Sequence, residues 1–163
     1  MTGKTLKIIR DAHQLFTGRG LRLSVAESCT GGLISHYLTW LPGSSVFFEA
    51  GVVTYSVSSK ENILGVSSET IATHGAVSSE TAKEMAEKMR LLSETDYALS
   101  TTGNLGPDVL EGKERGLIYV GISKEGETLI KELRLTGDRT QNKEEAALSS
   151  LRFLIDVLSE QKQ

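Results

Sequence analysis

The chain has 163 residues, of which 39% are hydrophobic and 24% charged, a balance that suits one ordinary globular domain. Its formal net charge of -3 argues against the clustered basic surface that gathers nucleic acid or anionic lipids. We therefore expect one domain over residues 1–163, with neither a nucleic-acid partner nor a membrane partner.

The N-terminal and cysteine patterns exclude further classes of protein. Residues 1–10 mix three basic residues with single apolar ones, which excludes a signal peptide and predicts a cytoplasmic location. The single cysteine, Cys29, excludes an intrachain disulfide. Three scattered histidines with that cysteine give no metal-ligand spacing, so we expect no structural metal.

The first half of the chain alternates helical and strand patterns. Apolar residues recur at helical spacing in some segments, and mostly apolar runs rich in Val and Phe suit buried strands in others. The expected elements are a helix over 5–16, a strand over 21–26, a helix over 33–41, a strand over 46–55, and brief helices over 58–64 and 67–73.

The second half gives stronger signals for element boundaries. Ser78 suits a helix N-cap, and Asp138 with Gln141 resembles a capping box. The expected elements are a helix over 78–90, a strand over 97–101, a polar loop over 102–115, a hairpin of strands over 116–123 and 128–135, and a terminal helix over 138–158. This order predicts an α/β fold: a single-domain three-layer sandwich with a mixed, mostly parallel sheet flanked by helices.

The most informative segment is the turn from Ala26 to Gly32, which lies between a predicted strand and a predicted helix. Unpaired backbone N–H groups and the helix dipole at such a turn can hold a phosphate, or the oxyanion that forms when a carbonyl is attacked. Gly31 and Gly32 would let a ligand approach closely. An ordinary helix capped by Ser28 or Thr30 explains the same spacing about equally well.

A serine nucleophile at this turn needs a base that removes its proton. The three histidines lie within or between helices, so the residues alone assemble no Ser-His-Asp triad. Lys60 follows an apolar strand and could enter a pocket, where its pKa would have to fall from about 10.4 toward about 7 to 8. A solvated lysine is the alternative, favoured about four to one. Cys29 could itself be a nucleophile, but a lone cysteine is more often a small buried hydrophobe.

Two further segments could bind a ligand. The glycine-containing loop Thr101–Pro107 follows a predicted strand, and ligands collect at the carboxyl ends of strands in open α/β sheets. A plain flexible connection is the alternative. Arg139 could clamp a phosphate, because a guanidinium binds phosphate in bidentate fashion, or it could instead pair with Asp138 or Glu144.

Taken in order, these segments resemble the CinA C-terminal domain family, whose stand-alone members are nicotinamide mononucleotide deamidases. The resemblance extends from about the first helix to Leu158. The motifs that carry it are Ala26–Gly32, Pro42–Ser45, Gly51–Ser56 with Lys60, Leu64–Val66, His74–Ser78, Thr102–Gly103 with Gly106–Pro107, and Gly137–Arg139.

The resemblance implies a serine amidase that uses neither a metal nor an organic cofactor. Ser28 would be the nucleophile, Lys60 its base, and Tyr55 would assist proton transfer or orientation. Backbone amides near Thr30 and Gly31 would form the oxyanion hole. The implied substrate is a small nucleotide: the carboxamide of nicotinamide mononucleotide is hydrolysed through an acyl-enzyme to nicotinate mononucleotide and ammonia. The residues implied to bind it are Thr30, Gly31, Gly32, Ser44, Ser45, Thr102, Gly103 and Arg139.

The sequence departs from the family pattern at three places. Residues 108–116 replace the usual glycines and Lys-Pro-Val-Gly segment, Val57 stands where Asn is common, and Lys143 stands where a second arginine is frequent. Because the serine, lysine and tyrosine positions are intact, we expect the amidase chemistry to be retained. A catalytically silent mononucleotide-binding module and an amidase for a different small carboxamide are the alternatives.

The sequence also bears on self-association. Trp40, Phe47 and Phe48 are large apolar residues that could join an interface between subunits as easily as a core. We expect a homo-oligomer.

Overall fold

Five strands form the central sheet of the protein. The structure, a computed structural model that describes residues 1–161, has the strand order β2-β1-β3-β4-β5. The strands are β1 (Leu23–Glu27), β2 (Phe48–Val53), β3 (Tyr97–Gly103), β4 (Leu117–Lys124) and β5 (Glu127–Arg134). β1 pairs in parallel with β2 and β3, whereas β4 pairs antiparallel with β3 and β5. Only β4 therefore runs against the other strands, which confirms the mixed, mostly parallel sheet.

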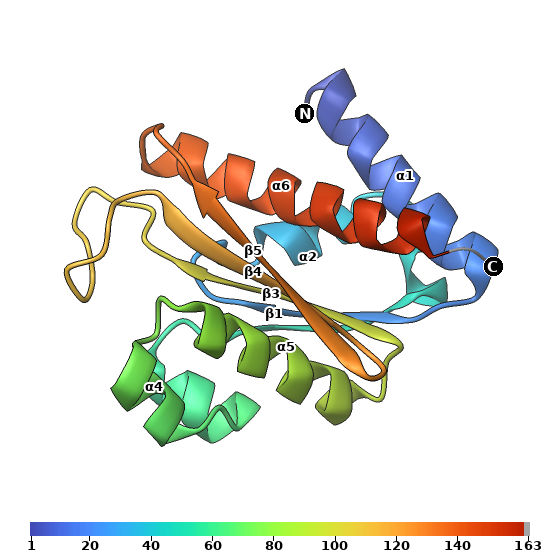
Figure 1. The fold of residues 1–163 in the computed structure, drawn as a ribbon. Coiled ribbons are helices and arrows are strands. Elements are labelled where there is room, and N and C mark those ends of the chain that lie inside the picture. The colour runs from blue at the N-terminus through green and yellow to red at the C-terminus, as the bar shows by residue number, and fades with distance from the viewer. Residues whose placement is uncertain (162–163) are drawn as a thin grey trace.

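Helices cover both faces of this sheet and complete the expected three-layer sandwich (Figure 1). One face carries α1 (Gly3–Arg19), α2 (Leu33–Leu38) and α6 (Arg139–Glu160). The other carries α3 (Val57–Ser59), the turn η2 (Lys60–Leu64), α4 (Ser68–His74) and α5 (Ser79–Ser93). Within residues 1–161 no helix has the length and apolar character needed to cross a bilayer.

The core occupies both sides of the sheet, because helices cover both of its faces. All five residues of β1 are buried, as expected for a strand flanked by two neighbours and two helical layers. Phe16 and Phe47 pack between the sheet and α1, and Met85 and Met89 pack between the sheet and α5. Phe47 therefore belongs to the core, whereas Trp40 is 50% exposed.

Several element boundaries differ from those expected. The strand expected over 46–55 is shorter, because residues 44–46 form a separate 3-10 turn, η1 (Ser44–Val46), and β2 begins only at Phe48. The helix expected over 33–41 ends at Leu38. The strand expected over 97–101 continues to Gly103, since its last residues pair with β4. Pairing with a distant strand leaves no local signal in the sequence.

The start of α6 follows the predicted capping box. The Gln141 amide donates to Asp138 Oδ1 at 2.9 Å, and the Asp138 amide donates to Gln141 Oε1 at 2.9 Å. The box fixes where the helix begins. As a result, Arg139 in its first turn lies beside the loop that follows β3, where it contacts the Gly106 carbonyl oxygen.

Candidate active site

A cavity of about 260 Å³ opens at the carboxyl ends of the three parallel strands. Ser28 follows β1, Tyr55 follows β2, and Gly103 ends β3. Arg139 closes the cavity from the start of α6. Loops after neighbouring parallel strands meet at one end of a sheet, which is where ligands bind in open α/β folds. The predicted ligand-binding end of the sheet therefore contains a cavity.

Ser28 and Lys60 meet at the edge of this cavity. Lys60 Nζ lies 2.7 Å from Ser28 Oγ, and the Lys60 side chain is only 2% exposed. The same amine donates to the carbonyl oxygens of Thr54 at 2.8 Å and Tyr55 at 3.2 Å. The alternative of a solvated lysine is therefore wrong.

A wide helical turn directs Lys60 inward. The helix expected over 58–64 is one α-helical turn followed by the π-helical turn η2, in which the Gly65 amide donates to the carbonyl oxygens of both Lys60 and Glu61. Such π-helical turns are rare in proteins, and a large share of those that occur lie at functional sites. Here the turn places Lys60 in the interior while Ile63 is 62% exposed.

The environment of Lys60 favours its neutral form. Burial lowers its pKa from 10.5 to about 8, although the negative charge of Glu111 opposes this shift. With that pKa, roughly a tenth of the Lys60 side chains are neutral at pH 7, against about 0.03% for an unperturbed lysine. A neutral amine has two N–H donors and one lone pair. In the neutral form, the two N–H groups of Lys60 can donate to the carbonyl oxygens of Thr54 and Tyr55. The lone pair on Nζ can then accept a hydrogen bond from the Ser28 hydroxyl.

Glu27 holds the Ser28 turn in place, a role that the sequence analysis missed. Its carboxylate is fully buried and accepts hydrogen bonds from Thr30 Oγ1 at 2.7 Å and from the Ile34 amide at 2.9 Å. It also accepts from the amide and the hydroxyl of Ser35, at 3.0 and 2.8 Å. A carboxylate that satisfies the free amides of a helix start fixes that start. The signal in the sequence was an acidic residue at the end of an otherwise apolar strand.

The backbone of the turn offers donors for an oxyanion. The Gly31 amide donates to the Ser28 carbonyl oxygen at 3.0 Å, so it is already engaged. Within residues 1–161, the amides of Cys29 and Thr30 have no oxygen acceptor. The donors near Ser28 are thus one residue earlier than expected. The Thr30 side chain points into the interior, where it contacts Thr101 Oγ1 at 2.8 Å, and not into the cavity.

Cys29 is a packing residue. Its side chain is buried in the larger core cluster, and burial raises the pKa of the thiol to about 12, although nearby Lys60 and a hydrogen bond to Thr101 oppose the rise. A thiol with that pKa stays protonated at neutral pH and is a poor nucleophile. The reading of Cys29 as a small buried hydrophobe is confirmed.

Arg139 joins α6 to the cavity. Its Nη1 donates to the Gly106 carbonyl oxygen at 2.6 Å, and its Nη2 donates to the Tyr55 hydroxyl at 3.0 Å. Both partners are uncharged, so the expected alternative of an ion pair with Asp138 or Glu144 is not formed. The guanidinium keeps further N–H donors for a ligand.

Comparison with known proteins identifies the family. The sequence model of the CinA C-terminal domain matches residues 6–158. The chain belongs to the CinA C-terminal domain family. The resemblance seen in the motifs is thereby confirmed.

Solved structures and curated relatives agree with this assignment. The CinA fold here superposes on competence damage-inducible protein A from Klebsiella pneumoniae with a TM-score of 0.94 at 31% identity, covering 97% of this chain and 99% of that one. A competence/damage inducible protein from Agrobacterium tumefaciens gives a TM-score of 0.92 at 36% identity, covering 98% of both chains. A CinA-like protein from Chloroherpeton thalassium is 44% identical over 152 residues, or 88% of this chain and 36% of that protein. The chain thus spans about a third of the length of such curated relatives.

Of the eight predicted binding residues, only Gly103 and Arg139 line the cavity of this CinA domain, and Thr30, Gly31, Gly32, Ser44, Ser45 and Thr102 do not. Ser44 and Ser45 are in η1, which precedes β2, so they lie at the opposite end of that strand from Tyr55. The Thr102 hydroxyl is buried and donates to the Ala76 carbonyl oxygen at 2.7 Å. Alternation along β3 sends neighbouring side chains to opposite faces of the sheet, which a motif alone does not resolve.

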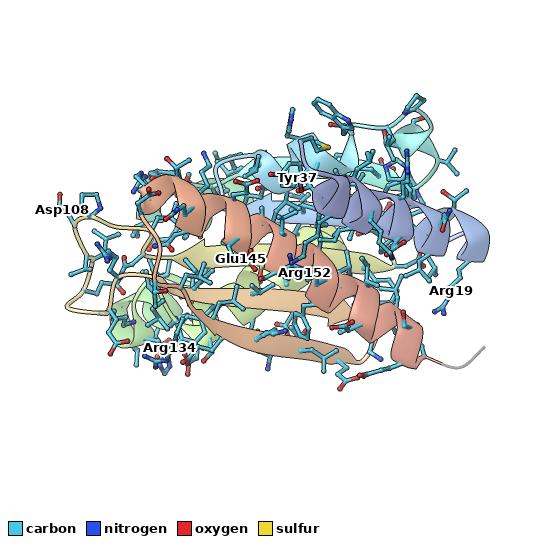
Figure 2. All side chains as sticks on the ribbon, turned by 90° about the horizontal axis from the view of Figure 1, so that it is seen from above. Arg19, Tyr37, Asp108, Arg134, Glu145 and Arg152 are labelled. Atoms are coloured by element: carbon cyan, nitrogen blue, oxygen red, sulfur yellow. The ribbon has the colours of Figure 1, made fainter. Side chains whose placement is uncertain are left out.

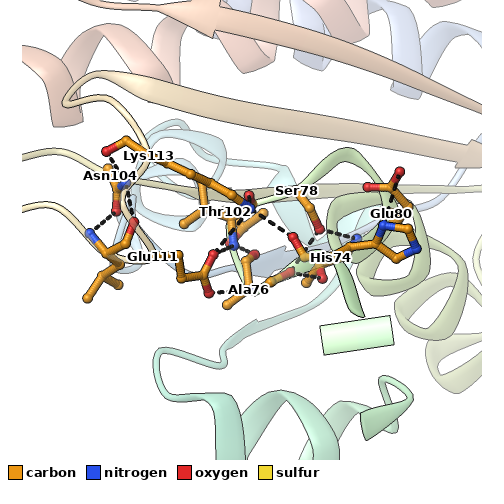
Figure 3. Close-up of polar contacts among 12 residues, drawn as sticks. His74, Ala76, Ser78, Glu80, Thr102, Asn104, Glu111 and Lys113 are labelled. Atoms are coloured by element: carbon orange, nitrogen blue, oxygen red, sulfur yellow. Dashed lines mark hydrogen bonds and ion pairs between the residues drawn. The ribbon is translucent and has the colours of Figure 1, made fainter. Parts of the chain in front are cut away.

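The segment over residues 108–116, which the sequence analysis expected to differ from the family pattern, is firmly anchored. Glu111 accepts hydrogen bonds from the Ala76 and Val77 amides at 2.7 and 3.2 Å (Figure 3). Although burial opposes it, these amides and Lys113 hold the pKa of the Glu111 carboxyl below its usual value. The anchored loop projects past the sheet, with Asp108 near its outer end (Figure 2), and it contributes Asp108 to the cavity lining.

The side chains of this site are not arranged as a metal centre. Within residues 1–161, no group of three or more His, Cys, Asp or Glu side chains could hold a metal ion. The cavity and its edge bring together the Ser28 hydroxyl, the buried Lys60 amine and the Arg139 guanidinium, groups that can activate a nucleophile and stabilise a developing negative charge.

Proposed function

We propose that this CinA domain is an amidase that hydrolyses the carboxamide of nicotinamide mononucleotide to nicotinate mononucleotide and ammonia. The observation that carries the proposal is the 2.7 Å contact between the Ser28 hydroxyl and the buried amine of Lys60, whose pKa lies at about 8. A general base is most effective when its pKa is close to the working pH. Membership of the CinA family supports the choice of substrate.

The first chemical step forms an acyl-enzyme. Neutral Lys60 accepts the Ser28 proton while Ser28 Oγ attacks the carboxamide carbon, and the carbonyl oxygen becomes an oxyanion. The amides of Cys29 and Thr30 donate to this oxyanion. Collapse of the tetrahedral intermediate breaks the carbon–nitrogen bond, and protonated Lys60 returns its proton to the departing ammonia.

The second step releases the acid. A water molecule attacks the ester at Ser28, Lys60 takes the proton of that water, and a second tetrahedral intermediate forms. When it collapses, the Ser28 oxygen leaves and recovers a proton from Lys60. One water is consumed for each ammonia and carboxylic acid produced, and the enzyme returns to its starting state. The Tyr55 hydroxyl, held by Arg139, orients the substrate at the mouth of the cavity.

One observation favours a second candidate, an amidase for a different small carboxamide. Asp108 and Leu110 come from the loop that departs from the family pattern, and both line the cavity. They change the charge and the shape that a ligand meets there. A panel of carboxamides tested beside nicotinamide mononucleotide would identify such a substrate by its higher kcat/KM.

The test of the proposed function is release of ammonia from nicotinamide mononucleotide. The unmodified protein should release ammonia, and Ser28→Ala and Lys60→Met should reduce the rate by at least about a thousandfold, since each removes a member of the catalytic pair. Lys124→Met, in the distant β4–β5 hairpin, is the matched control and should keep full activity. Binding of the nucleotide without release of ammonia would contradict the proposal and would support a silent binding module.

A further inference from the structure

The buried side chain of Asn104 holds the loop that follows β3. Asn104 comes directly after the last residue of that strand and is 3% exposed. Its Nδ2 donates to the carbonyl oxygens of Leu110 at 3.2 Å and Lys113 at 3.3 Å, and its Oδ1 accepts from the Leu110 amide at 3.2 Å (Figure 3). Both N–H donors of the Asn104 amide group are thus used, as burial of that group requires.

The backbone of Asn104 closes the same loop at its base. The Asn104 amide donates to the Leu117 carbonyl oxygen at 2.9 Å, and the Asn104 carbonyl oxygen accepts from the Gly116 amide at 2.7 Å. The loop over residues 105–115 therefore begins and ends at Asn104, and its turn over residues 110–113 is fastened to the Asn104 side chain. A single residue connects the sheet to the far part of the loop.

Apolar packing gives the outer part of this loop little support. The Val109 and Leu110 side chains are 45% and 60% exposed, whereas Leu105 is buried in the core. The outer part depends instead on polar contacts: those of Asn104 from within, and those of Glu111 with the amides of residues 76 and 77. Exposed chain with few apolar contacts opens locally when such hydrogen bonds are lost.

The loop forms part of the cavity wall. Its lining residues are Leu105, Gly106, Asp108 and Leu110. The carbonyl oxygens of Leu105 and Gly106 are also held from α6, by Asn142 at 3.0 Å and by Arg139 at 2.6 Å. Asp108 and Leu110 are therefore the lining residues that depend on Asn104. The contacts of Lys60 with Ser28 and with the carbonyl oxygens after β2 involve no residue of this loop.

We propose that Asn104 is a positioning residue, which fixes Asp108 and Leu110 in the cavity wall and thereby sets the affinity for the substrate. The statement about affinity rests on the proposed function, whereas the hold on the loop does not. A wall that is ordered before the ligand arrives spares binding the entropy cost of ordering it. Because the Ser28–Lys60 pair is held by other elements, loss of Asn104 weakens substrate binding and leaves the chemical step intact.

The test combines a readout without substrate and a readout with it. Asn104→Leu matches the branching of asparagine and removes all three side-chain hydrogen bonds. In the substrate-free variant the Leu110 amide should exchange with deuterium at least about tenfold faster, as followed by NMR. With nicotinamide mononucleotide, KM should rise at least about fivefold while kcat stays within about twofold, the pattern of weakened uniform binding. Val109→Ala, in the exposed part of the same loop, is the matched control and should leave the amide exchange, KM and kcat unchanged.

Unchanged exchange of the Leu110 amide in Asn104→Leu would overturn the hold on the loop, and a fall in kcat at constant KM would overturn the role in affinity. If Asn104→Leu does not fold, Asn104→Asp decides by the same rise in KM, because its second oxygen faces two carbonyl oxygens and cannot donate to them. Failure of the proposed function is a separate result: the unmodified protein would release no ammonia. Kd for the mononucleotide, measured by calorimetry, then replaces KM, and an unchanged Kd or no binding would overturn the role in affinity.

Discussion

Replacing Lys60 with methionine should change how the stability of the protein depends on pH. Burial lowers the pKa of Lys60 from 10.5 to about 8 in the folded protein. Each pKa unit corresponds to about 1.4 kcal/mol, so keeping this amine charged in the fold costs on the order of 3 kcal/mol at pH 7. Between those two pKa values the unfolded chain holds the proton and the folded protein does not. The free energy of unfolding contributed by Lys60 therefore rises with pH across this window.

The comparison with the methionine variant isolates this contribution, because methionine has a similar length and no proton to lose. The quantity to compare is the free energy of unfolding of the unmodified protein minus that of Lys60→Met. This difference should increase by roughly 2 to 3 kcal/mol between pH 7 and pH 10. Urea denaturation followed by circular dichroism measures both proteins, and Lys124→Met should follow the unmodified protein. Parallel pH curves for the unmodified protein and Lys60→Met would refute the shifted pKa and, with it, the role of Lys60 as base.

Three further substitutions test the parts of the site separately. Glu27→Gln should lower the free energy of unfolding in urea by about 2 to 4 kcal/mol, because four hydrogen bonds converge on that buried carboxylate; a loss below about 1 kcal/mol would mean that the turn does not depend on it. Cys29→Ala should keep most of the ammonia release, and a folded but inactive variant would point to the thiol as nucleophile. Glu111→Gln should raise KM severalfold by loosening the loop over residues 74–77, and an unchanged KM would show that this anchor does not shape the cavity.

The layers of the fold were predictable because each depends on a local pattern. Apolar spacing identified the long helices, and the capping residues at Asp138 and Gln141 located the start of α6 within one residue. The turn at Ser28 was visible as a glycine-flanked strand end. Such signals lie within a few neighbouring residues, where periodicity and capping act.

The pairing of groups within the site was not predictable from local pattern. Ser28 and Lys60 are 32 residues apart. The residues alone offered Lys60 as a candidate base but favoured a solvated side chain, and it was the family resemblance that assigned Lys60 to Ser28. Composition alone favoured an exposed Lys60. For Thr102 the error was in the other direction. Its motif suggested a contact with the ligand, but its hydroxyl donates to the buried Ala76 carbonyl oxygen instead. Such contacts depend on strand direction and on helix placement. Neither can be inferred from residues that are close together in the sequence.

The most direct measurement of the central claim is the titration of the Lys60 amine itself. Nitrogen-15 NMR of lysine side chains, with Lys60→Met used to assign the signal, gives the pKa of that group in the folded protein. The account predicts a midpoint at about 8, coinciding with the pH at which kcat/KM for nicotinamide mononucleotide reaches half its maximum. A Lys60 midpoint near 10.5, or an activity profile that does not follow it, would contradict the account.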